Sequence, residues 1–417
     1  MARPVVAPPR SSVPALSPSR RRPRRRRSAG ERVLKIAAIF VAVVLVVAGG
    51  VYGYLRYRLG QVKSINCATC AAVADGAPYN VLLVGSDSRV GNTGSASRAF
   101  GSASQVGGQR SDTIKILHVD PTSGTARLLS IPRDTYIALS DMPSGSGLAT
   151  DNKINTAFND GPGPLVQTIE STFGIPIAHF VIVDFSGVID LVNSVGGIKL
   201  DFPYPVRDND NGNNNSGLNI PQAGCQTLNG NMALALARSR YYEYEERPGY
   251  WVYDPSSDLG RIQRQNTIIE AVINKAKSSY NPLTINAFLG SIVHDIAKDN
   301  GMSSGAMLAL AQRYHAFSGS SLQTFTLPTT GGYSSVAGDV EVVQEPAAQQ
   351  VITQFLGSQP SSVVTAPLDA YGSPIAVPST VTSSPSGSSA RSGSSGASGS
   401  STPATVPGTG PFNPTPC

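Results

Sequence analysis

Residues 110–135 restrict the fold of this chain more than any other stretch of its sequence. Two apolar runs, 113–119 and 126–131, are rich in β-branched residues and leucine, and the sequence Asp-Pro-Thr-Ser-Gly separates them. Apolar runs of this length joined by turn-forming residues predict a β-hairpin. The hairpin is apolar enough to lie near the centre of a sheet, so we expect a fold with a β-sheet core.

Charged residues flank this hairpin and the apolar strand that is predicted upstream of it at 80–84. Each of the three strand ends delivers an acid and an arginine: Asp87 with Arg89, Arg110 with Asp112, and Arg133 with Asp134. Burying like charges together costs several kcal/mol each unless they share a counter-charge. A divalent cation together with an anionic phosphate ligand would satisfy both sets of charges at once.

An uncharged run of twenty residues, 36–55, is long enough to span the apolar layer of a bilayer. The basic sequence RRRPRRRR (20–27) precedes this run, whereas only three basic residues follow it closely. The positive-inside rule therefore places the N-terminus in the cytoplasm and the chain from residue 57 onward outside the membrane, which predicts a single-pass cell-membrane protein. A cleaved signal peptide is the alternative, because small residues occur at 47–50, but the apolar run continues past them.

The net charge of +6 describes the N-terminal tail rather than the main domain. Residues 1–35 contain ten Arg, one Lys and one Glu, and subtracting this +10 from the total leaves −4 for the rest of the chain. A mildly acidic domain is not typical of nucleic-acid-binding folds. We therefore expect no nucleic acid as a partner. The apolar run at 36–55 makes the lipid bilayer an expected partner.

Four cysteines lie in the part of the chain that is predicted to be outside the membrane, where disulfides form: Cys67, Cys70, Cys225 and Cys417. Cys67 and Cys70 form a C-x-x-C motif, but no second motif of this kind, nearby His or βαβ pattern supports a zinc or redox site. We expect structural disulfides, with all three pairings open.

The composition divides the chain into five parts: a disordered Arg-rich cytoplasmic tail (1–33), a transmembrane helix (34–56), an extracytoplasmic stem (57–77), one large folded domain (78–358) and a disordered Ser/Pro/Gly-rich tail (359–417). Within 78–358, apolar residues at four-residue spacing predict a helix over 165–173, and Asp184 is placed to cap another that Gly196 ends. Apolar strands alternate with these helices. This alternation predicts an α/β fold, an α/β/α sandwich around a central mixed β-sheet.

Two further helices carry phosphate-binding residue types at their ends. The helix predicted at 232–237 is followed by Arg238 and Arg240, and a long helix from Asp258 to about residue 277 carries Arg261 and Gln265 on one face. Helix N-termini favour anions, so the second helix offers a suitable place for a phosphate. Outside the tail there is no G-x-S-x-G, and the chain has no Walker loop or H-E-x-x-H motif. Arginine forks and hard carboxylates instead favour Mg²⁺-assisted chemistry on a diphosphate.

Seven strings in order resemble the successive motifs of the LytR-CpsA-Psr (LCP) family: NVLLVGSDSR (80–89), RSDT (110–113), LLSIPRDTY (128–136), KINTAF (153–158), FGIPIAHFVIVDFSGVIDLVNSVGGI (173–198), LNGNMALALARSR (228–240) and DLGRIQRQ (258–265). Together they run over a little under half of the chain. The N-terminal anchor also matches the family.

The resemblance implies an extracytoplasmic phosphotransferase that depends on Mg²⁺ (or Mn²⁺). Such an enzyme takes a glycopolymer from a polyprenyl-diphosphate carrier, attaches it to peptidoglycan through a phosphodiester, and releases polyprenyl phosphate. The apolar segments within 165–200 would help to form the family's lipid-chain pocket. The glycopolymer (teichoic acid, capsule or arabinogalactan) and the oligomeric state stay open.

Carried over residue by residue, the resemblance assigns Asp87 and Asp112 to the metal ion. The diphosphate would be bound by Arg89, Arg110, Arg133, Arg238, Arg240 and Arg261, with Gln265 in support. Lys153 and Asn155 either contact the diphosphate or only fix their loop. For the general base, Asp134 and Asp258 are the candidates, although they could equally serve as an arginine partner and a helix N-cap.

Residues 241–257 depart from the family pattern, because many members have a shorter link between the equivalents of Arg240 and Asp258. This segment of seventeen residues contains five Tyr and the only Trp of the chain. It is either a lid or sugar-stacking surface beside the site, or an ordinary surface excursion with self-packed aromatic residues.

Two rival functions stay open beside the transferase. A polyprenyl-diphosphate hydrolase would use the same metal and arginines with water as the acceptor. A non-enzymatic regulator or scaffold of the cell envelope would act through its basic cytoplasmic tail. We favour the transferase, because a scaffold has no need for so many convergent phosphate-binding groups.

Overall fold

The computed structural model describes residues 29–74, 76–86, 111–137, 153–159, 161–278, 286–290, 293, 296–314, 317, 319–335, 337–358 and 412–417. Three residues of the predicted site, Asp87, Arg89 and Arg110, lie outside the described residues, and so do 1–28 and 359–411 of the predicted tails. The chain divides into two units, one up to Tyr54 and one from Leu55 to Cys417, and each is treated by itself.

The first unit contains most of helix α1 (Ala29–Leu59). The 20 residues Phe40–Leu59 have a mean hydropathy of 1.6, so the helix is long and apolar enough to cross a membrane. The helix begins five residues earlier and ends three residues later than the predicted 34–56. Polar residues at both ends are good helix formers, and the apolar run alone did not reveal this extension.

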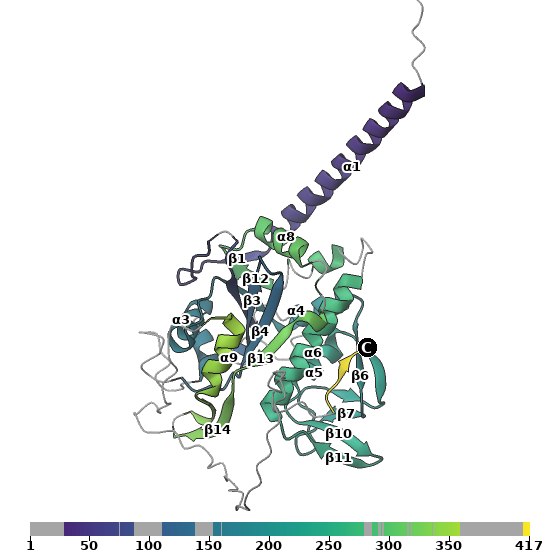
Figure 1. Cartoon of the computed structure of the whole chain (residues 1–417). Coiled ribbons are helices and arrows are strands. Elements are labelled where there is room, and N and C mark those ends of the chain that lie inside the picture. Colours follow the sequence, from purple (N-terminus) through teal and green to yellow (C-terminus); the bar gives the residue numbers. More distant parts are fainter. Residues whose placement is uncertain are drawn as a thin grey trace, which may run out of the picture. The chain divides into compact units, whose positions relative to one another are not determined.

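A mixed sheet of seven strands lies at the centre of the second unit (Figure 1). Its order is β1-β12-β5-β2-β3-β4-β13. The bounds are β1 Lys63–Ile65, β2 Tyr79–Ser86, β3 Ser111–Asp120, β4 Thr125–Ile131, β5 His179–Val183, β12 Ile296–Asp299 and β13 Gln323–Thr326. β3 and β4 pair antiparallel as the predicted hairpin, whereas β2 and β5 pair in parallel. The hairpin thus lies inside the sheet, as its apolar composition predicts.

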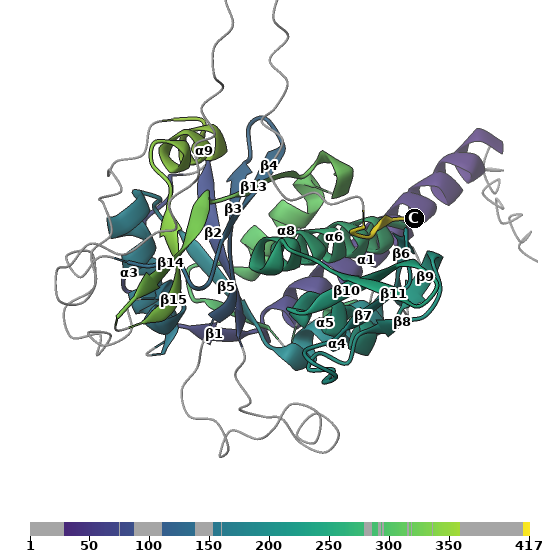
Figure 2. The same ribbon diagram turned by 90° about the horizontal axis from the view of Figure 1, so that it is seen from below.

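Helices cover both faces of this sheet, which gives the predicted α/β/α sandwich (Figure 2). The 3₁₀-helix η2 (Ile154–Phe158), α3 (Pro162–Phe173) and α9 (Ala347–Leu356) lie on one face, and their apolar residues form one buried core with β2, β3 and β4. The other face is covered by α4 (Phe185–Ser194), α5 (Gly230–Arg238) and α6 (Ser257–Ser278). Asp184 caps α4 as predicted, because its side chain accepts a hydrogen bond from the Gly187 N–H.

Small sheets extend the molecule beyond the sandwich. One contains β6 (Ile198–Phe202), β9 (Gly224–Leu228) and β16 (Thr415–Pro416), and another contains β7 (Val206–Asp208), β8 (Asn219–Ile220), β10 (Tyr242–Arg247) and β11 (Tyr250–Tyr253). The hairpin β14 (Thr329–Ser334)–β15 (Gly338–Val343), helix α8 (Ser304–Arg313) and the short η3 (Gly319–Ser321) complete the described elements. The aromatic segment 241–257 therefore forms mainly the β10–β11 hairpin.

The prediction of a single disordered tail over 359–417 is wrong for its last six residues. Strand β16 pairs antiparallel with β6, and Cys417 forms a disulfide with Cys225. The Phe412 ring stacks on Tyr244, with 4.6 Å between ring centroids. The polar composition of the tail hid this return, because one aromatic residue and one cysteine are its only signals. A second disulfide joins Cys67 and Cys70, so the cysteines are structural, as expected.

Candidate active site

A cavity of about 840 Å³ lies between the central sheet and helices α4, α5 and α6. Its polar part is lined by Asp112, Lys115, Arg133, Arg240, Arg261 and Gln265. Its apolar part is lined by side chains of the three helices, among them Val188, Leu191, Leu234, Ile268 and Val272. The cavity is therefore amphiphilic, with a charged wall that continues into an apolar one.

A β-bulge brings Asp112 to this cavity. Gly85 pairs with Thr113 and Ser86 pairs with Ser111, so Asp112 is an extra residue in β3. A bulge breaks the alternation of side chains along a strand, and Asp112 lines the cavity together with the adjacent Thr113. A Cβ on Gly85 would lie 2.8 Å from the Thr113 Cβ, which explains why glycine stands opposite the bulge.

Arg133 holds the two predicted acids of the hairpin together. Its Nη1 lies 2.5 Å from the Asp112 Oδ1, and its Nε lies 3.2 Å from the Asp134 Oδ2. Burial acts to lower the pKa of Arg133, but the charges of Asp134, Asp112 and Asp258 outweigh it and raise that pKa. The Arg240 Nη2 also reaches Asp112, at 3.8 Å. The structure thus brings Asp112, Asp134, Arg133 and Arg240 together, as the sequence predicted.

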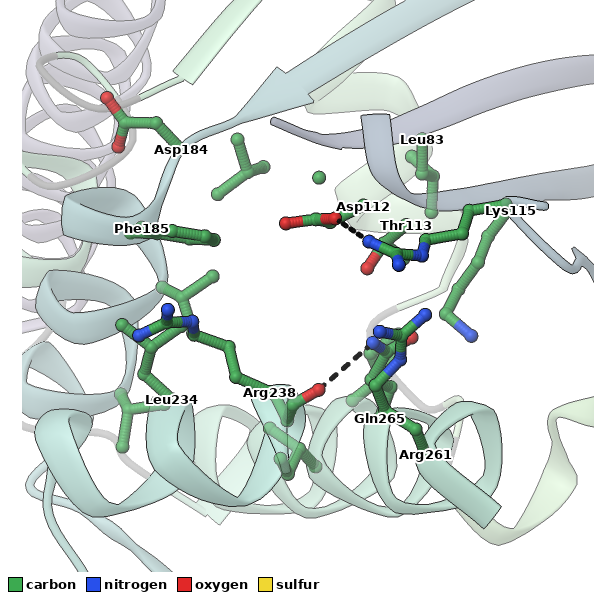
Figure 3. Close-up of a pocket in the computed structure, with 18 of the residues that line it drawn as sticks. Leu83, Asp112, Thr113, Lys115, Asp184, Phe185, Leu234, Arg238, Arg261 and Gln265 are labelled. Carbon is green, nitrogen blue, oxygen red and sulfur yellow. Dashed lines mark hydrogen bonds and ion pairs between the residues drawn. The ribbon is translucent and has the colours of Figure 1, made fainter. Parts of the chain in front are cut away.

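Helix α6 places Arg261 and Gln265 one turn apart on the cavity wall (Figure 3). Arg261 is 3% exposed and forms an ion pair with Asp258 in the first turn. Burial, Arg133 and Arg240 lower the pKa of Arg261, against the opposing effect of Asp258. The Gln265 Nε2 donates a hydrogen bond of 3.1 Å to the Ala237 carbonyl, which ties α6 to α5. Positive charge is thus concentrated at a site where an anion would be stabilised.

Arg238 lies on the opposite side of the cavity from Arg261 (Figure 3). Its guanidinium stacks over the Phe185 ring, 4.8 Å from the ring centroid. It lines the same cavity as the other described arginines, next to its apolar helices. The four phosphate-binding arginines that the structure describes, Arg133, Arg238, Arg240 and Arg261, therefore border one cavity without meeting at one point.

Lys153 and Asn155 stand beside the arginine cluster at the start of η2. The Lys153 Nζ lies 3.7 Å from the Asp134 Oδ1, and the Asn155 N–H donates to the Arg133 carbonyl at 3.1 Å. Asn155 is buried, and its Oδ1 has no hydrogen-bond partner among the described residues. These contacts fix the segment after β4. A contact of either residue with a diphosphate stays a prediction.

The two candidate bases both contact arginines. Asp134 pairs with Arg133 and Lys153. Asp258 lies in the first turn of α6, one residue after the helix begins, so it is an ion-pair partner of Arg261 rather than the N-cap. A catalytic role for either acid stays a prediction.

Three residues near the site were not found from the sequence. Lys115 is buried in the cavity wall, although it stands in an apolar run. The Asp208 Oδ2 accepts hydrogen bonds from the backbone N–H groups of Arg240 and Tyr241, at 3.2 and 3.4 Å, and so positions Arg240. Glu341 on β15 lies near Asp134 and Asp258, and burial raises its pKa. Only tertiary packing brings Asp208 and Glu341 here, and no local pattern signalled them.

The donor set of the cavity suits Mg²⁺ that is shared with a phosphate ligand. In the described part of the chain no three His, Cys, Asp or Glu residues group as a metal site. Magnesium, however, commonly uses one or two carboxylates and completes its shell with phosphate oxygens and water. Asp112 supplies one hard carboxylate beside the arginines, which fits this mode of binding.

Comparison with known proteins gives the chain its family. The model of the LytR_cpsA_psr family matches residues 58–355. The chain belongs to this family. A curated LytR_cpsA_psr relative, the Bacillus subtilis polyisoprenyl-teichoic acid–peptidoglycan teichoic acid transferase TagV, is 28% identical over 308 residues, which cover 71% of each chain. The probable cell wall biosynthesis protein LcpB of Corynebacterium glutamicum is 30% identical over 301 residues, covering 71% of this chain and 65% of LcpB.

Solved structures of LytR_cpsA_psr proteins show the same fold. The LytR-Csp2A-Psr enzyme from Actinomyces oris has a TM-score of 0.54 at 23% identity and covers 72% of this chain and 97% of its own. The crystal structure of B. subtilis TagV has a TM-score of 0.51 at 26% identity and covers 69% and 100%. The family and the α/β/α fold that the sequence predicted are therefore confirmed.

Proposed function

We propose that this protein transfers a glycopolymer from a polyprenyl-diphosphate carrier to peptidoglycan through a phosphodiester bond. The observation that carries the proposal is the amphiphilic cavity, where arginines border a wall that continues into apolar helix faces. A lipid diphosphate has this distribution of charge and apolar surface. The named activity of the relative TagV, a teichoic acid transfer to peptidoglycan, supports the same assignment.

Arg133, Arg240 and Arg261 are proposed to bind the phosphate oxygens, with Gln265 in support, Arg238 on the opposite side, and Arg89 and Arg110 completing the set. Guanidinium groups suit this role because they donate two parallel hydrogen bonds to one phosphate. Asp87 and Asp112 would hold Mg²⁺ (or Mn²⁺), which supplies charge neutralisation to the diphosphate. Lys153 would keep Asp134 in place, as their contact indicates.

In the proposed transfer, the acceptor hydroxyl attacks the sugar-side phosphorus. The bond between that phosphorus and the bridging oxygen breaks, and polyprenyl phosphate leaves with the electron pair. Catalysis of this kind consists mainly of positioning and of neutralising charge, which the arginines do. The hydroxyl proton passes to a carboxylate, for which Asp134 and Asp258 are the candidates.

The N-terminal helix is proposed to anchor the enzyme in the cell membrane, with the N-terminus in the cytoplasm. Its length and hydropathy fit a single span, and residues 20–27 supply the positive charge that the orientation rule requires. The anchor keeps the catalytic domain beside the bilayer that carries the lipid-linked donor.

The transferase is tested by the products formed from a donor labelled in its glycopolymer. We expect the purified protein to attach the label to peptidoglycan, and to release little free sugar phosphate without this acceptor. Equal release with and without peptidoglycan would identify the hydrolase instead. Arg133→Ala should abolish transfer, whereas Arg313→Ala should not, because the Arg313 Nη2 donates to the Thr122 carbonyl on the surface and Arg313 does not line the cavity. Full rescue of a deletion strain by Arg133→Ala would favour the scaffold.

A further inference from the structure

Lys115 is a buried lysine whose hydrogen-bond partners, among the described residues, are neutral. The side chain belongs to β3, is 2% exposed and lines the cavity. Its Nζ donates hydrogen bonds to the Ser130 Oγ at 2.9 Å and to the Asn266 Oδ1 at 2.7 Å. The nearby carboxylates are engaged elsewhere, because Asp112 pairs with Arg133 and Asp258 pairs with Arg261. A buried ammonium held only by neutral acceptors is costly, so an anion in the cavity would stabilise it.

Burial and the charge of Arg261 disfavour the protonated form of Lys115. Arg261 and Asp258 face it from α6, and Arg133 and Asp112 line the same cavity, while its β2 neighbour Leu83 is apolar. Burial and the charge of Arg261 lower the pKa of Lys115 to about 7, although Asp258 acts in the opposite direction. The amine therefore exchanges its proton near neutral pH, where a newly bound anion can change its charge.

Along the axis of α6, Lys115 lies at a level between the arginines and the apolar residues of the cavity. Its partner Asn266 follows Arg261 by five residues on α6, which is about 7.5 Å along the helix axis. The same helix continues with the apolar cavity residues Ile268 and Val272. On the sheet, Lys115 follows Asp112 and Thr113 along β3 as a lining residue of the cavity and pairs with Leu83. Along α6, the contact with Asn266 places Lys115 between the level of Arg261 and that of Ile268 and Val272. Figure 3 shows Lys115 beside Arg261, on the side of the cavity away from Phe185 and Leu234.

We propose that Lys115 is an additional anion subsite of this cavity, which contacts the lipid-side phosphate of a bound polyprenyl diphosphate. The inference rests on the proposed function. A donor whose chain lies along the apolar wall and whose sugar-side phosphate meets Arg133 carries its lipid-side phosphate at this level of α6. The approaching phosphate favours the ammonium form, so Lys115 takes one proton from solvent on binding. When the bond to the bridging oxygen breaks, the electron pair stays on the lipid phosphate, and the ammonium neutralises the added charge.

Calorimetric titration with geranyl diphosphate, a short soluble analogue, tests this subsite. The titration is run at pH 8 in two buffers with different enthalpies of ionisation, which gives the number of protons taken up per ligand bound. We expect the wild type to take up close to one proton. Lys115→Met should take up none and bind at least about tenfold more weakly. Lys115→Arg should bind tightly without proton uptake, because arginine is already charged.

Matched controls separate this role from a structural one. Lys298 is also buried, but its Nζ contacts the Asp299 carbonyl outside the cavity, so Lys298→Met should retain both affinity and proton uptake. The Ser130 Oγ and the Asn266 Oδ1 lie 3.5 Å apart and can pair directly when Lys115 becomes Met. Melting temperatures confirm that each variant is folded.

The outcomes distinguish the subsite from the proposed function. If the wild type binds the diphosphate and Lys115→Met binds it equally with the same proton uptake, Lys115 only ties β4 to α6 and the inference is overturned. If the wild type binds no geranyl diphosphate, the proposed function fails first. Geranyl monophosphate, whose single phosphate is on the lipid side, should also lose affinity in Lys115→Met. Unchanged binding of the monophosphate would contradict the assignment to that phosphate.

Discussion

The Asp112 carboxylate has two partners that would compete for its oxygens: Arg133 and the proposed metal ion. The carboxylate is paired with Arg133 in the described structure, and it is also the proposed ligand of the metal ion. A divalent cation and an arginine would compete for its oxygens, so a bound metal ion would free the Arg133 guanidinium to contact a phosphate. The proposed metal ion and the arginine cluster are therefore linked through Asp112.

Removal of the metal is the first prediction at this scale. We expect EDTA to abolish transfer by the wild type, and Mg²⁺ or Mn²⁺ to restore it, because two hard carboxylates and a diphosphate form a site for such ions. Asp112→Asn should raise the Mg²⁺ concentration needed for half-maximal rate. The measurement is the initial rate of label transfer against Mg²⁺ concentration, and a full rate in EDTA would contradict the metal site.

The pH dependence of stability gives the second prediction. The pKa of Lys115 is about 7 in the folded protein and about 10.4 in an unfolded chain. Between these values the unfolded state binds more protons, so the contribution of Lys115 to the free energy of unfolding rises with pH. Below pH 7 both states are protonated and the contribution no longer changes.

Urea unfolding of the wild type and Lys115→Met measures this effect, with the disulfides kept intact. We expect the wild type to gain stability relative to the variant between pH 7 and pH 10. A difference that stays constant over this range would show that Lys115 is not buried as a near-neutral amine.

Side chains at element ends could be predicted from the sequence, and buried partners could not. Asp112, Arg133, Arg240 and Arg261 are charged residues next to apolar runs, which is a local signal. Lys115 stands within an apolar run, and its role depends on residues of β2, β4 and α6 that packing brings to it. A sequence pattern has no access to such contacts.

At the scale of elements, the segment 241–257 combines features of both interpretations. Tyr242 is fully buried, and Tyr244 stacks on Phe412, so these two aromatic residues belong to a core. Tyr250 and Tyr253 are 51% and 43% exposed, and the Trp251 ring is covered by Arg207. The hairpin is thus an ordered extension of the β7 sheet with an exposed aromatic edge. Its proposed role as a lid or a sugar-stacking surface stays a prediction.

Helices α4 and α6 supply the third prediction, because they form the apolar wall of the cavity. Val272 lines this wall on α6. Val272→Trp should fill space that a long isoprenoid chain needs, and so lower the rate with a long-chain donor by roughly tenfold or more. Binding of geranyl diphosphate should change much less, because its chain is short.

The rate ratio between long-chain and short-chain donors is the measurement for this variant. Val272→Leu is the matched control, since it keeps an aliphatic side chain of similar size. An equal loss with both donors would place the lipid chain elsewhere.

The elements themselves were largely predictable, whereas their irregularities were not. Apolar runs joined by a turn predicted β3 and β4, four-residue spacing predicted α3, and a capping residue with a terminal glycine predicted α4, all close to their observed bounds. The bulge that turns Asp112 toward the cavity depends on the register with Gly85 and Ser86, which no single strand encodes. The cavity itself arises because α4, α5 and α6 pack partly on a second core rather than on the sheet.

At the scale of the whole molecule, the C-terminus is fastened to the domain. Cys417 is joined to Cys225 across 192 residues of sequence, and Asn413 accepts a hydrogen bond from the buried Arg264. A cross-link over a long loop removes much entropy from the unfolded chain. Composition predicted a tail without structure here, because only the cysteine and Phe412 distinguish the last residues from the rest.

The fourth prediction follows from this closure. Cys417→Ser should lower the free energy of unfolding by about 2–5 kcal/mol, and deletion of 412–417 should lower it further. Cys70→Ser should lower the free energy of unfolding less, because Cys67 and Cys70 are only three residues apart and close a very short loop. Thermal unfolding without reductant measures all three, and an unchanged melting temperature for Cys417→Ser would contradict the closure.

Photo-crosslinking shows whether one cavity binds the lipid diphosphate by both its charged and its apolar walls. A prenyl diphosphate that carries a photoreactive group at the end of its chain is bound to the protein and irradiated. Peptide mass spectrometry then locates the labelled residues. We predict labels on the cavity faces of α4 and α6, and their loss in Arg133→Ala or with excess unlabelled diphosphate. Labels spread over the surface, or unaffected by Arg133→Ala, would contradict the account.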